Sequence, residues 1–230
     1  MLDLKGYGWQ LAEGLWMTVR AGPVAMLLAI LLGLLGAGAK LSPSKPLQRI
    51  AGAYTVIVRG IPELVMILLV YFGGTILINA LVEALGSAER VDINAFTAGV
   101  GVIGFVYGAF ATEVFRGAFM AVPKGQAEAA KALGMSRFLI FRRILFPQVM
   151  RYAIPGLGNI WLVLLKATAL MSVVGLDELT RKAYIAAGAT REPFTFYFMA
   201  AVYYLALTLV SSILLQYLER RYSRGVRRAA

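Results

Sequence analysis

The sequence predicts an all-α polytopic membrane protein that crosses the bilayer five times. Of its 230 residues, 60% are hydrophobic and only 15% are charged, and the mean hydropathy is +0.73. Soluble domains are about half apolar and about a quarter charged, so this composition excludes an ordinary soluble domain. The apolar residues also gather into five stretches, each long enough for the roughly 20 residues that a helix needs to cross the hydrocarbon core.

The five predicted spans are separated by charged and helix-breaking residues. Pro43 and Pro46 interrupt the connection after the first span. Pro147 and Pro155 flank the start of the fourth span, and Pro193 stands where a fifth helix can begin. Without a clear internal repeat, we expect residues 1–230 to form one membrane domain, with spans at about 15–39, 54–81, 96–115, 153–175 and 194–218.

The charges between the spans predict the orientation of the chain. Segments 40–49, 116–151 and 219–228 lie on one side of a five-span arrangement and hold fifteen basic residues against two acidic ones. Segments 3–13, 83–92 and 177–192 lie on the other side and hold five basic and eight acidic residues. Because basic residues are enriched in cytoplasmic loops, we expect the N-terminus outside the cytoplasm and the C-terminus inside it.

Charge and composition exclude several classes of function. The orientation accounts for the net charge of +11, so we expect no nucleic-acid partner. The chain has no Cys and no His, which removes thiolate nucleophiles, imidazole bases and the usual zinc ligands. We therefore expect no catalytic residue, no metal and no cofactor on this chain, and an intramembrane enzyme is the least favoured class.

Two glycine-rich segments look superficially like nucleotide-binding motifs. Residues 99–104 fit the pattern G-x-G-x-x-G, but they lie inside a predicted span, where small residues serve close helix packing. Residues 36–40 lack the Gly-Lys-Ser/Thr ending of a phosphate-binding loop. We therefore expect any ATP used by this protein to bind to another chain.

The long connection 116–151 contains the best candidate for a contact surface. Residues 126–133 favour a helix, and Gly134 follows where a left-handed residue closes one. Four alanines leave this helix with little side-chain bulk, so another protein can approach its backbone closely. Residues 136–146 mix aromatic side chains with three arginines, which is typical of a helix at the membrane interface. The residues alone leave a partnerless amphipathic loop helix equally open.

The spacing in this connection resembles the EAA signature of bacterial ABC-importer permeases. Glu128-Ala129-Ala130 and Gly134 are followed by an apolar run that ends at Pro147, with Phe146 where the family usually has Leu. "RGIPELVMILLVYFG", "YGAFATEVFRGAFMAVPKGQAEAAKALG" and "RYAIPGLGNIWLVLLKATAL" are similar to the polar-amino-acid permease family, above all to the Q-type subunits of histidine/lysine-arginine-ornithine and opine importers.

The resemblance implies a type I ABC-importer transmembrane domain in the bacterial inner membrane. Its cytoplasmic coupling helix would dock on an ATPase subunit through Gly125, Glu128, Ala129, Ala130, Gly134 and Pro147. The implied partners are an ATPase pair that binds ATP and Mg, a second membrane subunit (a paralogue or another copy of this chain) and a periplasmic binding protein. The implied cargo is a basic amino acid (histidine, arginine, lysine or ornithine). An opine importer and a membrane scaffold for an ATPase remain the alternatives.

Polar residues within the spans favour a transport subunit over a scaffold. Ionisable groups in a bilayer are costly and usually paired or functional. Lys166 lies near the middle of the fourth span, and we expect it to border a pathway and to meet a substrate carboxylate or a span carboxylate. The candidate pathway residues are Glu63, Glu113, Lys166, Thr168 and Ser172, with the last three expected on one face.

Simple local ion pairs are the alternative for the span carboxylates. Arg59 and Glu63 are expected near the cytoplasmic start of the second span, and Glu113 lies three residues before Arg116. The fourth connection carries charges that we expect to face a binding protein: Asp177, Glu178, Arg181 and Lys182. The alternative is that they face only solvent.

Overall fold

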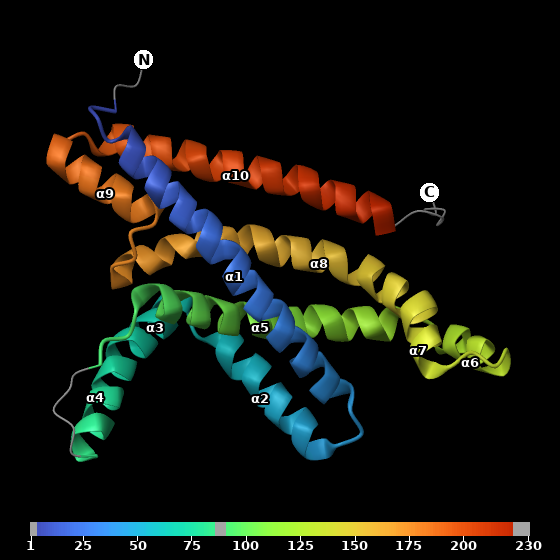
Figure 1. Cartoon of the computed structure of the whole chain (residues 1–230). Helices are drawn as coiled ribbons and strands as arrows, with labels where there is room; N and C mark the ends of the chain where they lie inside the picture. Colours follow the sequence, from blue (N-terminus) through green and yellow to red (C-terminus); the bar gives the residue numbers. More distant parts are fainter. Residues whose placement is uncertain (1–3, 86–90, 223–230) are drawn as a thin grey trace.

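The computed structural model describes residues 4–85 and 91–222, and within these ranges the regular structure is entirely helical (Figure 1). Five helical segments are long and apolar enough to cross a membrane. They are Gly8–Leu41, Glu63–Ala84, Ala95–Ala121, Arg137–Val174 and Pro193–Tyr222. The predicted all-α architecture with five spans is therefore confirmed.

The helices follow one another with short connections. In chain order they are α1 (Gly8–Leu41), α2 (Lys45–Gly60), α3 (Glu63–Leu68), η1 (Leu69–Gly73), α4 (Gly74–Ala84), α5 (Ala95–Ala121), α6 (Lys124–Ala132), α7 (Arg137–Ile140), η2 (Phe141–Leu145), α8 (Phe146–Ala167), η3 (Thr168–Val174), α9 (Leu179–Thr190) and α10 (Pro193–Tyr222). The start of α1 lies with α9 at one end of the molecule, and α6 lies at the other (Figure 1). We call these the α9 end and the α6 end.

Helices α1 and α5 form the closely packed centre of the fold. A Cβ added at Gly33 of α1 would lie 2.6 Å from the Cβ of Ala111, and one added at Gly104 of α5 would lie 2.6 Å from Leu28. Real Cβ atoms do not approach this closely, so glycine at these positions lets the two backbones touch. Most of the buried apolar side chains gather around this pair.

The glycine-rich segment 99–104 of α5 has the packing role that its sequence predicts at two of its three glycines. A Cβ at Gly99 would lie 2.8 Å from Met171 of η3, and Gly104 meets α1 as described above. Gly101 has nothing within 4 Å of an added Cβ, because it faces an open groove instead of a helix.

The second span is divided differently from the predicted range 54–81. Helix α2 ends at Gly60, Ile61 has an extended conformation, and α3 begins at Glu63. Pro62 explains the break, because proline lacks an N–H and disfavours the helical conformation in the preceding residue. The stretch then continues through the π-helix η1 into α4, and Ile67 is its only buried side chain in the isolated chain.

The fourth span is also longer and less regular than the predicted range 153–175. It starts at α7, passes through the π-helical η2 and continues as α8. Its last seven residues form the 3₁₀ segment η3, which stops where Gly175 takes a φ of +88°. Residues 136–146 are therefore the start of this long helix, not a separate interfacial helix.

Candidate functional site

Helix α6 ends in a Schellman motif. Gly134 has a φ of +78°, which confirms the predicted left-handed residue. The amide of Gly134 donates to the carbonyl of Lys131 at 3.0 Å, and the amide of Met135 donates to that of Ala130 at 3.2 Å. These two bonds satisfy carbonyl groups that the end of a helix otherwise leaves unpaired, so Gly134 fixes where α6 stops.

Most of α6 is exposed. Gly125, Glu128 and Ala129 face outward, whereas Ala130 is buried against the chain. Glu128 has no ion pair with any residue that the structure describes. Nothing lies within 4 Å of a Cβ added at Gly125, so the fold of this chain itself does not require glycine there. Leu133, 83% exposed at the C-terminal end of α6, adds a large apolar group to this surface.

A hydrogen bond joins α6 to the start of the fourth span. The side-chain amide of Gln148 in α8 donates to Gln126 of α6 at 2.5 Å and to the carbonyl of Ile144 at 2.8 Å. Pro147 stands in the first turn of α8. These residues also line an open cavity of about 420 Å³ between α6 and the α8 segment. Figure 1 shows α6 beyond the end of the long helices.

Glu113 belongs to an ion network that connects three helices. Its carboxylate pairs with Lys40 of α1 and accepts from Nε of Arg116 at 2.9 Å. Lys40 also donates to the hydroxyl of Thr55 in α2 at 2.6 Å. The predicted local pair between Glu113 and Arg116 is confirmed, and with two cations already beside it Glu113 does not pair with Lys166.

Glu63, the first residue of α3, hydrogen-bonds to α5. Its carboxylate accepts a hydrogen bond of 3.3 Å from the hydroxyl of Tyr107, a residue near the middle of α5. The expected position at the start of the second span is confirmed, since that span begins at Glu63 after the break at Pro62. The alternative Arg59–Glu63 pair is absent among the described residues, since the Arg59 guanidinium lies over the Phe110 ring, 4.9 Å from its centroid.

Lys166, Thr168 and Ser172 do not share one face of a regular helix. Lys166 is exposed and makes no hydrogen bond or ion pair with the residues that the structure describes. Thr168 is fully buried, and its hydroxyl donates to the carbonyl of Leu165 at 2.7 Å. Ser172 is half-buried. The prediction of one shared face failed for Thr168, because residues two apart in an α-helix lie about 200° apart around its axis, so Thr168 points into the packed chain while Lys166 points out of it.

Helix α9, in the connection between the fourth and fifth spans, was not predicted. Glu178 caps it: its carboxylate accepts from the amides of Thr180 and Arg181, and from the hydroxyl of Tyr204 in α10 at 3.0 Å. Thr18 of α1 accepts from the amide of Leu179 at 3.3 Å.

Burial distinguishes Glu178 from the other charges of this connection. Glu178 is fully buried, so it does not face outward as predicted. Its burial raises the pKa of the carboxyl group above its ordinary value, although its hydrogen bonds act in the opposite direction. The sequence did contain a signal for the helix, namely an acidic residue directly before a run of helix formers.

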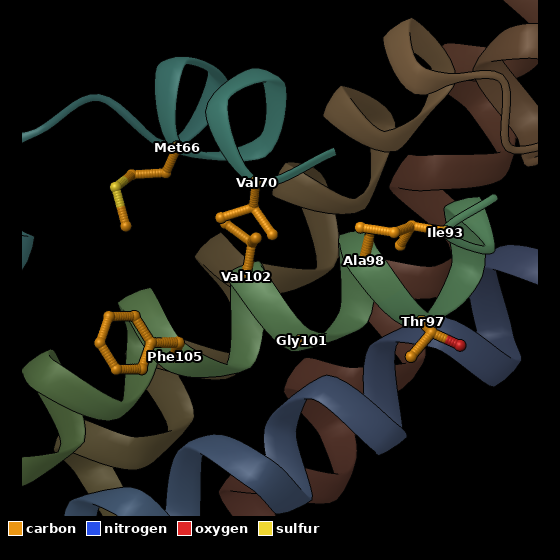
Figure 2. A pocket seen from close by; sticks show the side chains of 8 residues that line it. All are labelled: Met66, Val70, Ile93, Thr97, Ala98, Gly101, Val102 and Phe105. Carbon is orange, nitrogen blue, oxygen red and sulfur yellow. The ribbon is translucent and has the colours of Figure 1, made fainter. Parts of the chain in front are cut away.

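An apolar groove lies between the second span and α5. Figure 2 shows Met66 and Val70 on one side of it and Val102 and Phe105 on the other. The groove has a volume of about 440 Å³, and Thr97 is the only polar side chain among its lining residues. It therefore offers no ion pair to a charged small molecule, and the polar chemistry of this chain lies elsewhere.

Comparison with known proteins agrees with this arrangement. A family model described as "binding-protein-dependent transport system inner membrane component" matches residues 29–224. The chain is 46% identical over 226 residues to the histidine/lysine/arginine/ornithine transport system permease protein HisQ of Escherichia coli (strain K12), across 98% of this chain and 99% of that protein. It is 44% identical to the octopine transport system permease protein OccQ of Rhizobium radiobacter, across 97% and 94%.

Solved structures with the same architecture include ABC transporters. One is the crystal structure of an amino acid ABC transporter with histidines, with a TM-score of 0.78 and 36% identity across 94% of this chain and 95% of that one. An inward-facing MetNI methionine ABC transporter, at a TM-score of 0.73 and 20% identity across 94% and 97%, shows the same fold. The chain thus belongs to the family of binding-protein-dependent transport system inner membrane components.

Proposed function

We propose that this chain is the amino-acid-conducting membrane subunit of an ATP-driven importer. The observation that carries the proposal is the full-length similarity to HisQ, at 46% identity across 98% of the chain. The proposed cargo is a basic amino acid: histidine, arginine, lysine or ornithine. An opine is the second candidate, which the 44% identity to OccQ supports.

Helix α6 is the proposed docking element for an ATPase subunit. Gly125, Ala129 and the exposed charge of Glu128 form a surface that a partner's backbone can approach closely. Gly134 fixes where α6 ends, and Pro147, in the first turn of α8, lines the cavity beside α6. In this proposal ATP and Mg bind to the ATPase pair, because this sequence lacks a phosphate-binding loop.

The α6 end is proposed to face the cytoplasm and the α9 end the periplasm. The segments at the α6 end carry most of the basic residues, in line with the bias of cytoplasmic loops. A periplasmic binding protein would then deliver substrate to the α9 end. A second membrane subunit, either a paralogue or another copy of this chain, would complete the pathway beside the exposed second span.

Lys166 is the proposed pathway cation. It is exposed on the side of α8 away from the packed centre, together with Asn159, two turns away, which sequence reasoning missed. Glu63 and Thr168 are hydrogen-bonded within the chain, and Ser172 lies in η3, which continues α8 beyond Lys166. Glu113 supports the fold through its ion network. An unpaired cation within a span is costly in lipid, so its exposure favours a polar pathway.

Transport by the complete complex tests the proposal. The chain is co-purified with its neighbouring membrane, ATPase and binding-protein subunits and reconstituted in proteoliposomes with a panel of amino acids and opines. We expect ATP-dependent uptake of arginine, histidine or ornithine. Uptake of opines alone would select the second candidate, and ATPase activity without uptake of any compound would indicate a scaffold.

A variant at Lys166 tests the pathway itself. We expect Lys166→Met to reduce uptake at least tenfold while binding-protein-stimulated ATPase activity persists, because the substrate carboxylate loses a cation. Lys45→Met, which removes an exposed cation from the first turn of α2, outside the membrane spans, is the control and should transport normally. Wild-type uptake by Lys166→Met would remove Lys166 from the pathway.

A further inference from the structure

A polar cavity lies at the α9 end of the molecule. It has a volume of about 320 Å³ and is bounded by η3, α9 and α10. Its lining residues are Ser172, Val173, Thr180, Arg181, Tyr184 and Tyr197. Five of these six side chains carry an N–H or O–H donor, and none carries a carboxylate. Pockets that bind small ligands in proteins begin at about 300 Å³, so this cavity suits a single small anion-bearing molecule.

Arg181 is the charged group of this cavity, and it is held in place by two bonds. Its Nε donates to the carboxylate of Asp177 at 3.1 Å, and its Nη1 donates to the carbonyl of Ser172 at 3.3 Å. A guanidinium has five N–H donors in a planar fork, so most of them remain available beside the described residues. A fork of this kind matches the two oxygens of a carboxylate.

The first turn of α9 presents this fork from a rigid support. Glu178 is fully buried, and its carboxylate accepts from the backbone amides of Thr180 and Arg181. At Gly14 of α1, an added Cβ would lie 2.9 Å from the Cα of Leu179. Because α1 and α10 hold this turn from both sides, the donors are positioned before a ligand arrives, which favours binding.

The 3₁₀ segment η3 turns the cavity toward Lys166. From Lys166 to Ser172 there are two α-helical steps and four 3₁₀ steps, so the two residues differ by about 40° around the axis and about 11 Å along it. A regular α-helix would place them about 120° apart. The irregular end of the span thus aligns a residue of the cavity with the exposed lysine.

We propose that this cavity is an entry site for the α-carboxylate of the transported amino acid, held by Arg181 and the surrounding hydroxyls before the substrate reaches Lys166. The proposal rests on the proposed function. The rings of Tyr184 and Tyr197, which are 65% and 43% exposed, provide faces for a cationic or aromatic side chain. Asp177, which pairs with both Arg181 and Lys182, would provide a carboxylate for the substrate's α-ammonium group.

Competition by decarboxylated analogues tests the proposal in the reconstituted complex. The probes are radiolabelled L-arginine with agmatine as competitor, and L-histidine with histamine. We expect Arg181→Gln to raise the KM for uptake about tenfold, the effect of losing a charge-assisted hydrogen bond. The variant should also discriminate less between each amino acid and its amine. Tyr197→Phe should give a smaller shift of the same kind without any change in charge.

Controls separate this site from folding, from docking and from the proposed function. Arg191→Gln removes a cation from the other end of α9 and should leave KM unchanged. Arg181→Gln should leave the binding-protein concentration for half-maximal ATPase stimulation unchanged.

The outcomes distinguish the entry site from the proposed function. If wild-type uptake is normal but neither Arg181→Gln nor Tyr197→Phe alters the KM or the competition, the entry site alone is overturned. A raised binding-protein requirement with unaltered competition would make Arg181 a docking contact. No wild-type uptake of either amino acid would overturn the proposed function, and the entry site with it.

Discussion

Replacing Gly134 with alanine tests whether the end of α6 must be closed for transport. Gly134 has a φ of +78°, and nothing lies within 4 Å of an added Cβ. The cost of Gly134→Ala is therefore conformational, about 1–2 kcal/mol for a Cβ in the left-handed region. That free energy lowers the ratio of closed to open Schellman motif about 5- to 30-fold. We expect the rate of uptake to fall by a similar factor while the complex still assembles.

Uptake and ATPase activity in proteoliposomes, at equal amounts of assembled complex, measure this effect. Gly134→Asn should fall between alanine and wild type, because asparagine tolerates the left-handed conformation better. Gly134→Asp adds a charge at the same place and should uncouple ATPase activity from uptake. Gly125→Ala introduces no strain within the chain, so any loss there reports contact with the partner. Wild-type uptake by Gly134→Ala would refute the reasoning, and equal losses for alanine and asparagine would point to side-chain size instead.

Two further predictions concern stability, measured by thermal unfolding of the purified complex. Gly33→Ala places a Cβ 2.6 Å from that of Ala111 and should lower the free energy of unfolding by about 1–3 kcal/mol. Gly38→Ala is the control, because its added Cβ meets nothing within 4 Å. Equal unfolding temperatures for the two variants would contradict the close packing of α1 and α5. Because burial raises the pKa of Glu178 above 4.5, the folded state binds this proton more tightly than the unfolded state. The free energy of unfolding should therefore fall as pH rises from about 4.5 through the raised pKa and then level off. Glu178→Gln should lack this fall in the free energy of unfolding. Identical pH dependence in the wild type and the variant would be evidence against a raised pKa of Glu178.

Local backbone chemistry explains what the sequence predicted well. The left-handed conformation at Gly134 can be predicted because a run of helix-forming residues ends directly before this glycine. The prediction needs no information from elsewhere in the chain. The five spans follow from hydropathy alone. The break at Pro62 was equally visible in the sequence, but the continuous apolar run on both sides outweighed it in the prediction of one span.

Contacts between distant residues explain what the sequence did not predict. Glu178 is buried because Thr18, Gly14 and Tyr204 surround the first turn of α9, and these residues lie far from it in sequence. The pairing of Glu113 with Lys40, which lies on another helix, was missed for the same reason. The position of Ser172 depends on the change from the α-helix α8 to the 3₁₀ segment η3, which no local pattern of apolar residues predicts.

The close contact between α1 and α5 has a mechanical consequence for the whole subunit. Only Val122 and Pro123 separate the end of α5 from α6, so a force applied to α6 reaches α5 through almost no flexible chain. Because glycines bring α5 against the backbone of α1, and Lys40 bonds to Glu113, the two helices resist sliding past each other. We expect them to rotate together as one stiff lever. The second span, in which few residues are buried inside this chain, is then the part free to shift around it.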